Sequence, residues 1–421
     1  MPTDLNVGIL AFELYIPSSF VSQEALEISH NVASGKFTKG LGQLEMGFCG
    51  DNEDINSICL TVVSKLLNRF PGLEHNIGRV SVGTESSVDK SKSVKSVLMR
   101  LFSSSSLDIE GCDVINACYG GTQALFDTIA WVESSAWDGR LAIVVTADIA
   151  VYDEGPARPT GGAGAVAMLI GPNAPLVFSP IRSSFSTDVR DFFKPRLSSE
   201  YPIVNGKTSI DSYLNAVSQC WSGFKSKYLR KFNTKISVND VDFLLFHAPF
   251  HKMVQKAFNR LIEDDLGEQS KNVVEELFQS KVLPGQTLCR RVGNMYCASL
   301  YGSLISLIFG INFEPGQKVL MFSYGSGLCS SMFLIETRDV SSTFDLRSIK
   351  IDLNSILSSR VEVEPNIFSK ILNDRCNFVK TIESGSFDCL SPTFDCSTLF
   401  DGTFYISHVD SNLIRHYDVK N

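Results

Sequence analysis

The chain has 421 residues, of which 44% are apolar and 20% are charged, and its formal net charge is −8. A chain of this length and apolar content buries more surface than one hydrophobic core usually accommodates, so we expect two domains or two fused halves rather than a disordered chain. The acidic balance argues against non-specific nucleic-acid binding, and no run approaches the ~20 apolar residues of a membrane span.

Strand-like and helix-like segments alternate along the chain. In the first half, apolar runs predict strands at 7–16, 79–83, 113–117, 141–149 and 163–170, and helices at 55–70, 91–102 and 121–134. In the second half, the same alternating pattern predicts strands at 241–246, 318–323 and 331–336, and helices at 209–232, 250–262 and 296–309. Near-continuous apolar strands between helices indicate an α/β fold whose sheets are covered on both faces.

Two pairs of segments look alike across the halves. A buried strand, a glycine-rich stretch and a second strand fill 141–171 and recur at 318–336. Asn116-Ala-Cys-Tyr-Gly-Gly-Thr opens one helix, and Gly293-Asn-Met-Tyr-Cys-Ala-Ser opens another. Internal duplication explains both pairs, and coincidence between two ordinary α/β units is the alternative. We expect a first half at 4–174 and a second at 175–421, with the proline- and serine-rich segment 172–207 as an irregular joint.

Cys118 lies between a short strand and a helix that begins with two glycines. The free amides and the dipole at a helix N-terminus favour an anion such as a thiolate. The glycines let a substrate carbonyl approach the backbone amides, as in an oxyanion hole. A small buried cysteine under a helix is the alternative. The context makes Cys118 a candidate nucleophile.

His247 ends a buried strand, where α/β folds place their active sites. It could act as a general acid or donate to a carbonyl oxygen, and a histidine satisfied by a nearby carbonyl is the alternative. His251 follows four residues later, but Pro249 between them argues against a shared helical face and no third ligand stands out. We therefore predict no metal site.

Charged residues flank two further predicted elements. Glu85 ends a buried strand, where a carboxylate can have a raised pKa and act as a base, or can simply flank the next helix. Lys252 and Lys256 lie four apart on the helix after His247, so they form a basic stripe suited to phosphates or an ordinary solvated face.

The chain has eleven cysteines and no Cys-x-x-Cys. This usage argues against zinc ribbons and dithiol redox motifs, and it favours a reducing compartment with mostly buried thiols and no structural disulfide. The first strand-like run begins at Val7, which leaves no room for a transit segment, so we expect a cytoplasmic protein.

Distinctive blocks occur in order from about Val7 to about Tyr405. They are Gly40-Leu-Gly-Gln43, Val82-Gly-Thr-Glu85, Asp89-Lys-Ser-Lys-Ser-Val-Lys95, Asn116-Ala-Cys-Tyr-Gly-Gly-Thr122, Trp137-Asp-Gly-Arg140, Ala157-Arg-Pro-Thr-Gly-Gly-Ala-Gly-Ala165, Ser199-Glu-Tyr-Pro-Ile-Val204, Phe246-His-Ala-Pro249, Lys252-Met-Val-Gln-Lys256, Gly293-Asn-Met-Tyr296 and Phe322-Ser-Tyr-Gly-Ser-Gly-Leu328. Together these blocks resemble the 3-hydroxy-3-methylglutaryl-CoA synthases of the thiolase superfamily. The resemblance implies a duplicated thiolase-like α/β fold with five layers, αβαβα, and a homodimer.

The resemblance also implies a catalytic trio at Glu85, Cys118 and His247. Cys118 would take the acetyl group of acetyl-CoA as a thioester, whose α-hydrogens are acidic enough for a carboxylate base. Glu85 would remove a methyl proton, and the carbanion would add to the ketone of acetoacetyl-CoA. His247 would hold and protonate the alkoxide, and water would release the product from the enzyme. No metal or bound cofactor is implied, because both acyl-CoAs are substrates.

Further positions follow from the resemblance one by one. Residues expected to contact substrate or coenzyme A are Ser34, Tyr119 in the acyl pocket, Thr160, Ser209, Lys252, Lys256, Asn294 and Ser326. Asp148 and Asp191 match acids that support the site. Ala33 and Pro156 depart from the family pattern near the coenzyme A site. Another acyl-CoA condensing enzyme or a thiolase is the main alternative, and a Cys-His hydrolase or a silent binding protein is a third.

Overall fold

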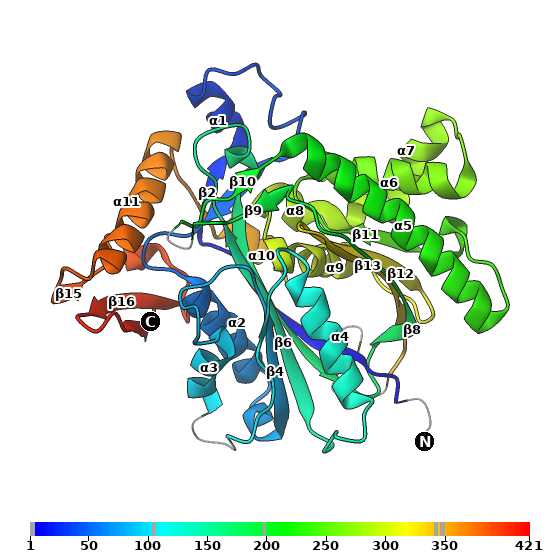
Figure 1. Ribbon diagram of the computed structural model, residues 1–421, viewed down its shortest axis with the longest axis horizontal. Coiled ribbons are helices and arrows are strands. Elements are labelled where there is room, and N and C mark those ends of the chain that lie inside the picture. Colours follow the sequence, from blue (N-terminus) through cyan, green and yellow to red (C-terminus); the bar gives the residue numbers. More distant parts are fainter. Residues whose placement is uncertain (1–4, 103–106, 197–198, 341–343, 346–349) are drawn as a thin grey trace.

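The computed structural model describes the chain except residues 1–4, 103–106, 197–198, 341–343 and 346–349 (Figure 1). Within the described residues, a nine-stranded mixed sheet runs through the molecule. Its strands are β1 (Gly8–Tyr15), β4 (Ile77–Gly83), β5 (Asp113–Val114), β6 (Leu141–Ala150), β7 (Gly162–Gly171), β8 (Leu176–Ser186), β11 (Phe243–Phe246), β12 (Lys318–Gly325) and β13 (Cys329–Thr337).

The strand order is mirrored about the middle of this sheet. From the centre outward, one side runs β1, β7, β6, β4, β5 and the other runs β8, β13, β12, β11. On each side the first two pairings are antiparallel and the third is parallel, and β1 pairs antiparallel with β8 at the centre. An internal duplication produces this arrangement, so the predicted duplicated α/β fold is confirmed.

Helices cover the sheet in layers. The main helices are α2 (Ile55–Arg69), α4 (Gly120–Val132), α5 (Gly206–Phe232), α6 (His251–Leu266) and α9 (Ser299–Gly310). Alternate β1 side chains enter different cores, because Tyr15 packs with α2 while Phe12 packs with α4 and α9. In the same way β12 turns Met321 toward α9 and Phe322 toward α5 and α6. Helices α4 and α9 therefore form the central layer between two portions of sheet, with α2 outside one and α5 and α6 outside the other.

The predicted irregular joint at 172–207 is wrong for its first part. Residues Leu176–Ser186 form β8, which lies next to the centre of the sheet. The register between β8 and β13 shifts between Phe178 and Arg182, around Pro180. Proline has no amide to donate to the ladder, so this central strand carries a bulge at Pro180, where its sequence is least typical of a strand.

Several elements have other bounds than the sequence predicts or were not predicted. The predicted helix at 91–102 is α3 (Val94–Leu98) followed by a 3₁₀ turn at Met99–Phe102, and the strand at 113–117 ends at Val114. The remaining elements include α1 (Gln23–Ser29), β2 (Ser19–Ser22), β3 (Glu45–Phe48), β9 (Phe192–Phe193), β10 (Ile203–Val204), α7 (Lys271–Lys281), α8 (Thr287–Val292), α10 (Leu353–Ser358), β14 (Val361–Glu362), α11 (Pro365–Ser384), β15 (Cys389–Leu390), β16 (Phe404–Asp410) and β17 (Arg415–Val419). The C-terminal elements α11 and β15–β17 pack beside the first half, at the left of Figure 1.

Among the described residues, no helix combines the length and the apolar character that crossing a membrane requires.

Strand β4 and helix α4 approach each other through glycine. A Cβ at Gly83 would lie 2.2 Å from Cα and 2.3 Å from N of Gly121. We expect Gly83→Ala to push α4 away from the sheet and to lower the free energy of unfolding by about 1–3 kcal/mol, the usual effect of overpacking. Chemical denaturation measures this. Gly310→Ala is the matched control, because its Cβ would meet Pro284 O at an ordinary 3.5 Å. Equal stability of the two variants would contradict this account.

Candidate active site

Cys118 lies in a tight turn between β5 and α4. Ala117 before it has a positive φ of 39°, and the amide of Tyr119 donates to Asn116 O at 2.9 Å. A Cβ at Gly120 would lie 2.5 Å from Val114 O, so only glycine lets the helix start this close to the strand. The turn presents the half-buried Cys118 side chain to a pocket.

His247 lies at the end of β11 on the other side of the same pocket. Its backbone amide donates to Phe322 O at 2.7 Å, and the Tyr213 hydroxyl donates to its carbonyl at 2.6 Å. The ring faces that of Tyr324, with ring centres 6.5 Å apart. The residue is 3% exposed, and burial lowers the pKa of His247 to about 3. The imidazole is therefore neutral at physiological pH.

The pocket that Cys118 and His247 share has a volume of about 260 Å³. Four of the predicted binding residues line it: Thr160, Ser209, Asn294 and Ser326. Much of the remaining wall is apolar or aromatic, and includes Leu41, Phe192, Ile210, Phe250 and Met253. An apolar pocket with a few convergent polar groups fits an acyl chain held by its carbonyl.

Asn294 and Ser326 are oriented by their neighbours. Oδ1 of Asn294 accepts from the amide of Tyr296 and from the Ser299 hydroxyl, both at 2.9 Å, which turns its amide donor toward the pocket. The carbonyl of Ser326 accepts from Asn116 Nδ2 at 3.5 Å, beside the Cys118 turn. The two halves of the chain therefore meet around the nucleophile.

Glu85 lies behind this pocket rather than on its wall. Its carboxylate pairs with Lys194 Nζ at 3.1 Å and lines a neighbouring cavity of about 190 Å³. The Lys194 ammonium also lies 4.9 Å from the ring centre of Tyr296, which lines the acyl pocket. Burial raises the pKa of Glu85 to about 7, although Lys194 opposes this shift, and Asp148 adds to it. A carboxylate with this pKa is suited to general base catalysis near neutral pH.

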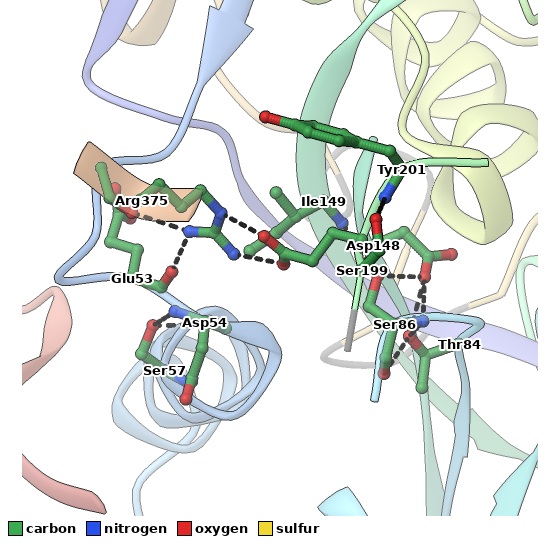
Figure 2. Close-up of polar contacts among 12 residues, drawn as sticks. Glu53, Asp54, Ser57, Thr84, Ser86, Asp148, Ile149, Ser199, Tyr201 and Arg375 are labelled. Carbon is green, nitrogen blue, oxygen red and sulfur yellow. Dashed lines mark hydrogen bonds and ion pairs between the residues drawn. The ribbon is translucent and has the colours of Figure 1, made fainter. Parts of the chain in front are cut away.

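Asp148 fixes the segments that carry the site, and Figure 2 shows it beside Thr84 and Ser86. Its Oδ1 accepts from the Thr84 hydroxyl at 2.8 Å and from the amides of Glu85 and Ser86 at 2.9 Å. Its Oδ2 accepts from the Cys297 amide at 2.9 Å. This buried carboxylate therefore joins the Glu85 strand end to the second half.

The thiolate expected from the helix N-terminus is not favoured at Cys118. Burial raises the pKa of the Cys118 thiol, and the nearby carboxylates of Glu85 and Asp148 raise it further, while Lys194 opposes them. The resting side chain is therefore a thiol that must lose its proton during attack. Cys297, at the equivalent position in the second half, is buried, and its thiol donates to Ala117 O at 3.0 Å. It supports the Cys118 turn.

Tyr119 and Asp191 also do not line the pocket. Tyr119 does not line the acyl pocket as expected, because its hydroxyl turns inward and shares a 2.7 Å hydrogen bond with the hydroxyl of Ser331. Tyr152 and Tyr296 line the pocket instead. Asp191 accepts from the Tyr324 hydroxyl at 3.0 Å and from the Gly327 amide at 3.1 Å, so it holds the loop that carries Ser326.

Three of the residues predicted to contact coenzyme A do not line the pocket: Ser34, Lys252 and Lys256. The amide of Lys252 donates to the carbonyl of Leu41, a pocket residue, at 2.9 Å. Lys256 is exposed one turn further along α6, and Ser34 is exposed on the loop after α1. The carboxylate of Glu27 accepts from amides on this loop and fixes it in place. The departure at Pro156 falls on the pocket wall itself.

The chain is similar to known proteins over nearly its whole length. A family model described as "Hydroxymethylglutaryl-coenzyme A synthase N terminal" matches residues 2–175, and its C-terminal counterpart matches 176–277 and 262–420. Hydroxymethylglutaryl-CoA synthase A of Dictyostelium discoideum is 44% identical over 98% of this chain and 90% of that protein. The human mitochondrial hydroxymethylglutaryl-CoA synthase is 43% identical over 98% and 89%.

The chain belongs to the hydroxymethylglutaryl-CoA synthase family. A solved structure described as MvaS in complex with 3-hydroxy-3-methylglutaryl coenzyme A is also similar, with 28% identity, 99% of both chains covered and a TM-score of 0.86. Another, described as HMG-CoA synthase complexed with CoA, shares the fold with 23% identity and a TM-score of 0.82, over 98% of this chain and 99% of that one.

For this member of the synthase family, sequence reasoning missed Lys194, Tyr152, Tyr213 and Tyr324. Lys194 follows the two-residue strand β9, in the segment interpreted as an irregular joint. No periodicity marks it, and 109 residues separate it from Glu85. Tyr213 lies on α5, Tyr324 lies near the end of β12 and Tyr152 follows β6, so no local pattern distinguishes them from packing residues.

Proposed function

We propose that this protein condenses acetyl-CoA with acetoacetyl-CoA and water to give 3-hydroxy-3-methylglutaryl-CoA and CoA, in the mevalonate and isoprenoid pathway. One observation carries the proposal: a cysteine at a helix start and a neutral histidine share one acyl-sized pocket, with a buried carboxylate behind it. Family membership over nearly the whole chain supports it.

In the first step, the Cys118 sulfur attacks the carbonyl of acetyl-CoA. Because the resting group is a thiol, a base must take its proton, and the neutral imidazole of His247 on the same pocket is available. The proton then leaves with the CoA thiolate. Asn294 is oriented to donate to the acyl oxygen.

In the second step, Glu85 takes a proton from the acetyl methyl group and the carbanion attacks the ketone carbon of acetoacetyl-CoA. Its pKa of about 7 lets the carboxylate accept this proton near neutral pH and give it up again. Because burial keeps the His247 imidazole neutral, its role is to donate a hydrogen bond to the forming alkoxide. The proton held by Glu85 then neutralises the alkoxide.

The function is tested by following acetoacetyl-CoA absorbance with and without acetyl-CoA. We expect loss that depends on acetyl-CoA, with 3-hydroxy-3-methylglutaryl-CoA as the product by mass. A thiolase would instead cleave acetoacetyl-CoA with free CoA. Thiolases use a second cysteine as base, and the Cys297 thiol is engaged with Ala117 O. Rapid thiolysis without condensation would contradict the proposal.

No metal or bound cofactor takes part in this scheme, because both acyl-CoAs are substrates.

We also propose that the protein is a cytoplasmic homodimer. All eleven cysteines are unpaired, which suits a reducing compartment. Strand β5 is an edge of the sheet, and Ile115 beside it is 70% exposed, which suits pairing with a second copy. Analytical sedimentation tests the homodimer, and cell fractionation tests the cytoplasmic location.

Lys194→Met is expected to move the pH dependence of condensation. Glu85 must be ionised to act, and removing the nearby ammonium raises its pKa above about 7, with Asp148 still adding to the rise. Each unit of that rise lowers the ionised fraction at neutral pH by up to about tenfold. The acid limb of the kcat profile should therefore shift upward, with recovery at alkaline pH. Lys194→Arg keeps the charge and should shift less. A decrease in kcat that is equal at every pH would indicate that Lys194 has a purely structural role.

A further inference from the structure

The cavity behind Glu85 is separate from the acyl pocket. Its volume is about 190 Å³, and its wall includes Glu85, Ser86, Lys194, Glu200, Arg375 and Arg415. In Figure 2, Arg375 and Glu53 lie on one side of this region and Ser86 and Ser199 on the other. The acyl pocket contains Cys118 and His247 but not Glu85, so the carboxylate faces the second cavity.

The charged part of this wall suits water. The guanidinium of Arg375 binds both carboxylate oxygens of Glu200, at 2.8 and 2.7 Å. Arg415 pairs with Asp54 at 2.8 Å. Charged groups that are already paired still offer hydrogen bonds to water. Apolar side chains complete the wall: Val88, Ile149, Phe378, Val379 and Ile406. A site for one water needs ~10–15 Å³, so this cavity holds several.

The order in which bonds form and break in the reaction indicates what the cavity does. After condensation, the product is attached at both ends: one carbonyl is a thioester to Cys118 and the other is still a thioester to CoA. The CoA arm therefore occupies the acyl pocket when water must reach the Cys118 thioester. The entrance used by the substrates is blocked at the step that consumes water.

We propose that the cavity behind Glu85 is the route by which water reaches the acyl-enzyme, an inference that rests on the proposed function. Water gives a proton to Glu85 as its oxygen attacks the carbonyl carbon. The bond from that carbon to the Cys118 sulfur then breaks, and the leaving thiolate takes the proton from Glu85. At the end of the step Cys118 is again a thiol, the product carries a new carboxylic acid, and Glu85 is again a carboxylate. The Lys194 ammonium, between the cavity and the Tyr296 ring, holds Glu85 at the boundary between the two spaces.

Filling the mouth of the cavity tests the route. Ser87 and Val88 are exposed and line it, whereas Lys90 is exposed on the same loop and does not. We expect Ser87→Trp to leave acetylation by labelled acetyl-CoA unchanged and to slow hydrolysis of the condensed acyl-enzyme about tenfold, so that this intermediate accumulates under rapid quench. Hydrolysis of the acetyl-enzyme without acetoacetyl-CoA should slow much less, because the acyl pocket is then open to water.

Lys90→Trp should match the wild type, and Val88→Trp should repeat the result if Ser87→Trp is unstable. Unchanged hydrolysis of the condensed intermediate in a folded mouth variant would overturn the proposal. Equal slowing of acetylation and both hydrolyses would also overturn it, because that indicates general damage. A wild-type protein that forms no acyl-enzyme at all would instead refute the proposed function.

Discussion

Cys118→Ala is expected to abolish the acetyl-enzyme and to lower kcat for condensation by at least ~10³-fold, because it removes the thiol that forms the thioester through which the reaction passes. Cys118 is the cysteine that lines the acyl pocket, and its turn is fixed by backbone bonds that alanine preserves. The intermediate is measured by mixing the protein with labelled acetyl-CoA, quenching with acid and counting the label that stays on the protein. The absorbance assay measures turnover.

Cys112→Ala is the matched control, because Cys112 is exposed six residues earlier and lies outside the pocket. It should keep wild-type labelling and turnover. Label retained by Cys118→Ala would assign the acetyl group to another residue, and Cys297 would be the next candidate. Because the Cys297 thiol donates to Ala117 O, its labelling would require the turn to open.

The sequence singles out three candidate site residues because each follows a predicted strand. Glu85 and His247 follow the buried ends of β4 and β11, whereas Cys118 follows the half-buried, two-residue strand β5. The structure brings Cys118 and His247 onto one pocket, with Glu85 behind it. The alternation of strands and helices predicts the α/β class, because it depends on local hydrophobic periodicity. The duplication is visible for the same reason, since each half repeats the same local pattern.

The rest depends on contacts that local patterns do not record. Lys194 reaches Glu85 only because β9 folds over the site, and Asp148 collects donors from two distant segments. The protonation state of Cys118 shows the same limit. A helix N-terminus favours a thiolate locally, but burial and two carboxylates from other strands outweigh it. The missed strand β8 was hidden by Pro180, whose bulge the sheet tolerates.

Glu85→Gln is expected to separate acetylation from condensation. The amide keeps the size of the side chain but cannot take a proton, so loss of a general base should lower condensation by ~10²–10⁴-fold. Acetylation should continue, because it uses Cys118 and the neutral His247 on the acyl pocket, away from the Glu85 cavity. Removing a negative charge near Cys118 also lowers the pKa of its thiol, since Glu85 now raises it. The variant should therefore form its acetyl-enzyme at least as readily as the wild type.

Deuterium exchange measures the missing step directly. In D₂O, the methyl group of a wild-type acetyl-enzyme should exchange its hydrogens through Glu85, and the Glu85→Gln acetyl-enzyme should not. Glu154→Gln, a change to an exposed carboxylate outside both cavities, should leave exchange and turnover unaltered. Exchange at the wild-type rate in Glu85→Gln would show that another group removes the methyl proton. The burial of Glu85 and its pairing with Lys194 would then serve only to hold the wall of the cavity behind it.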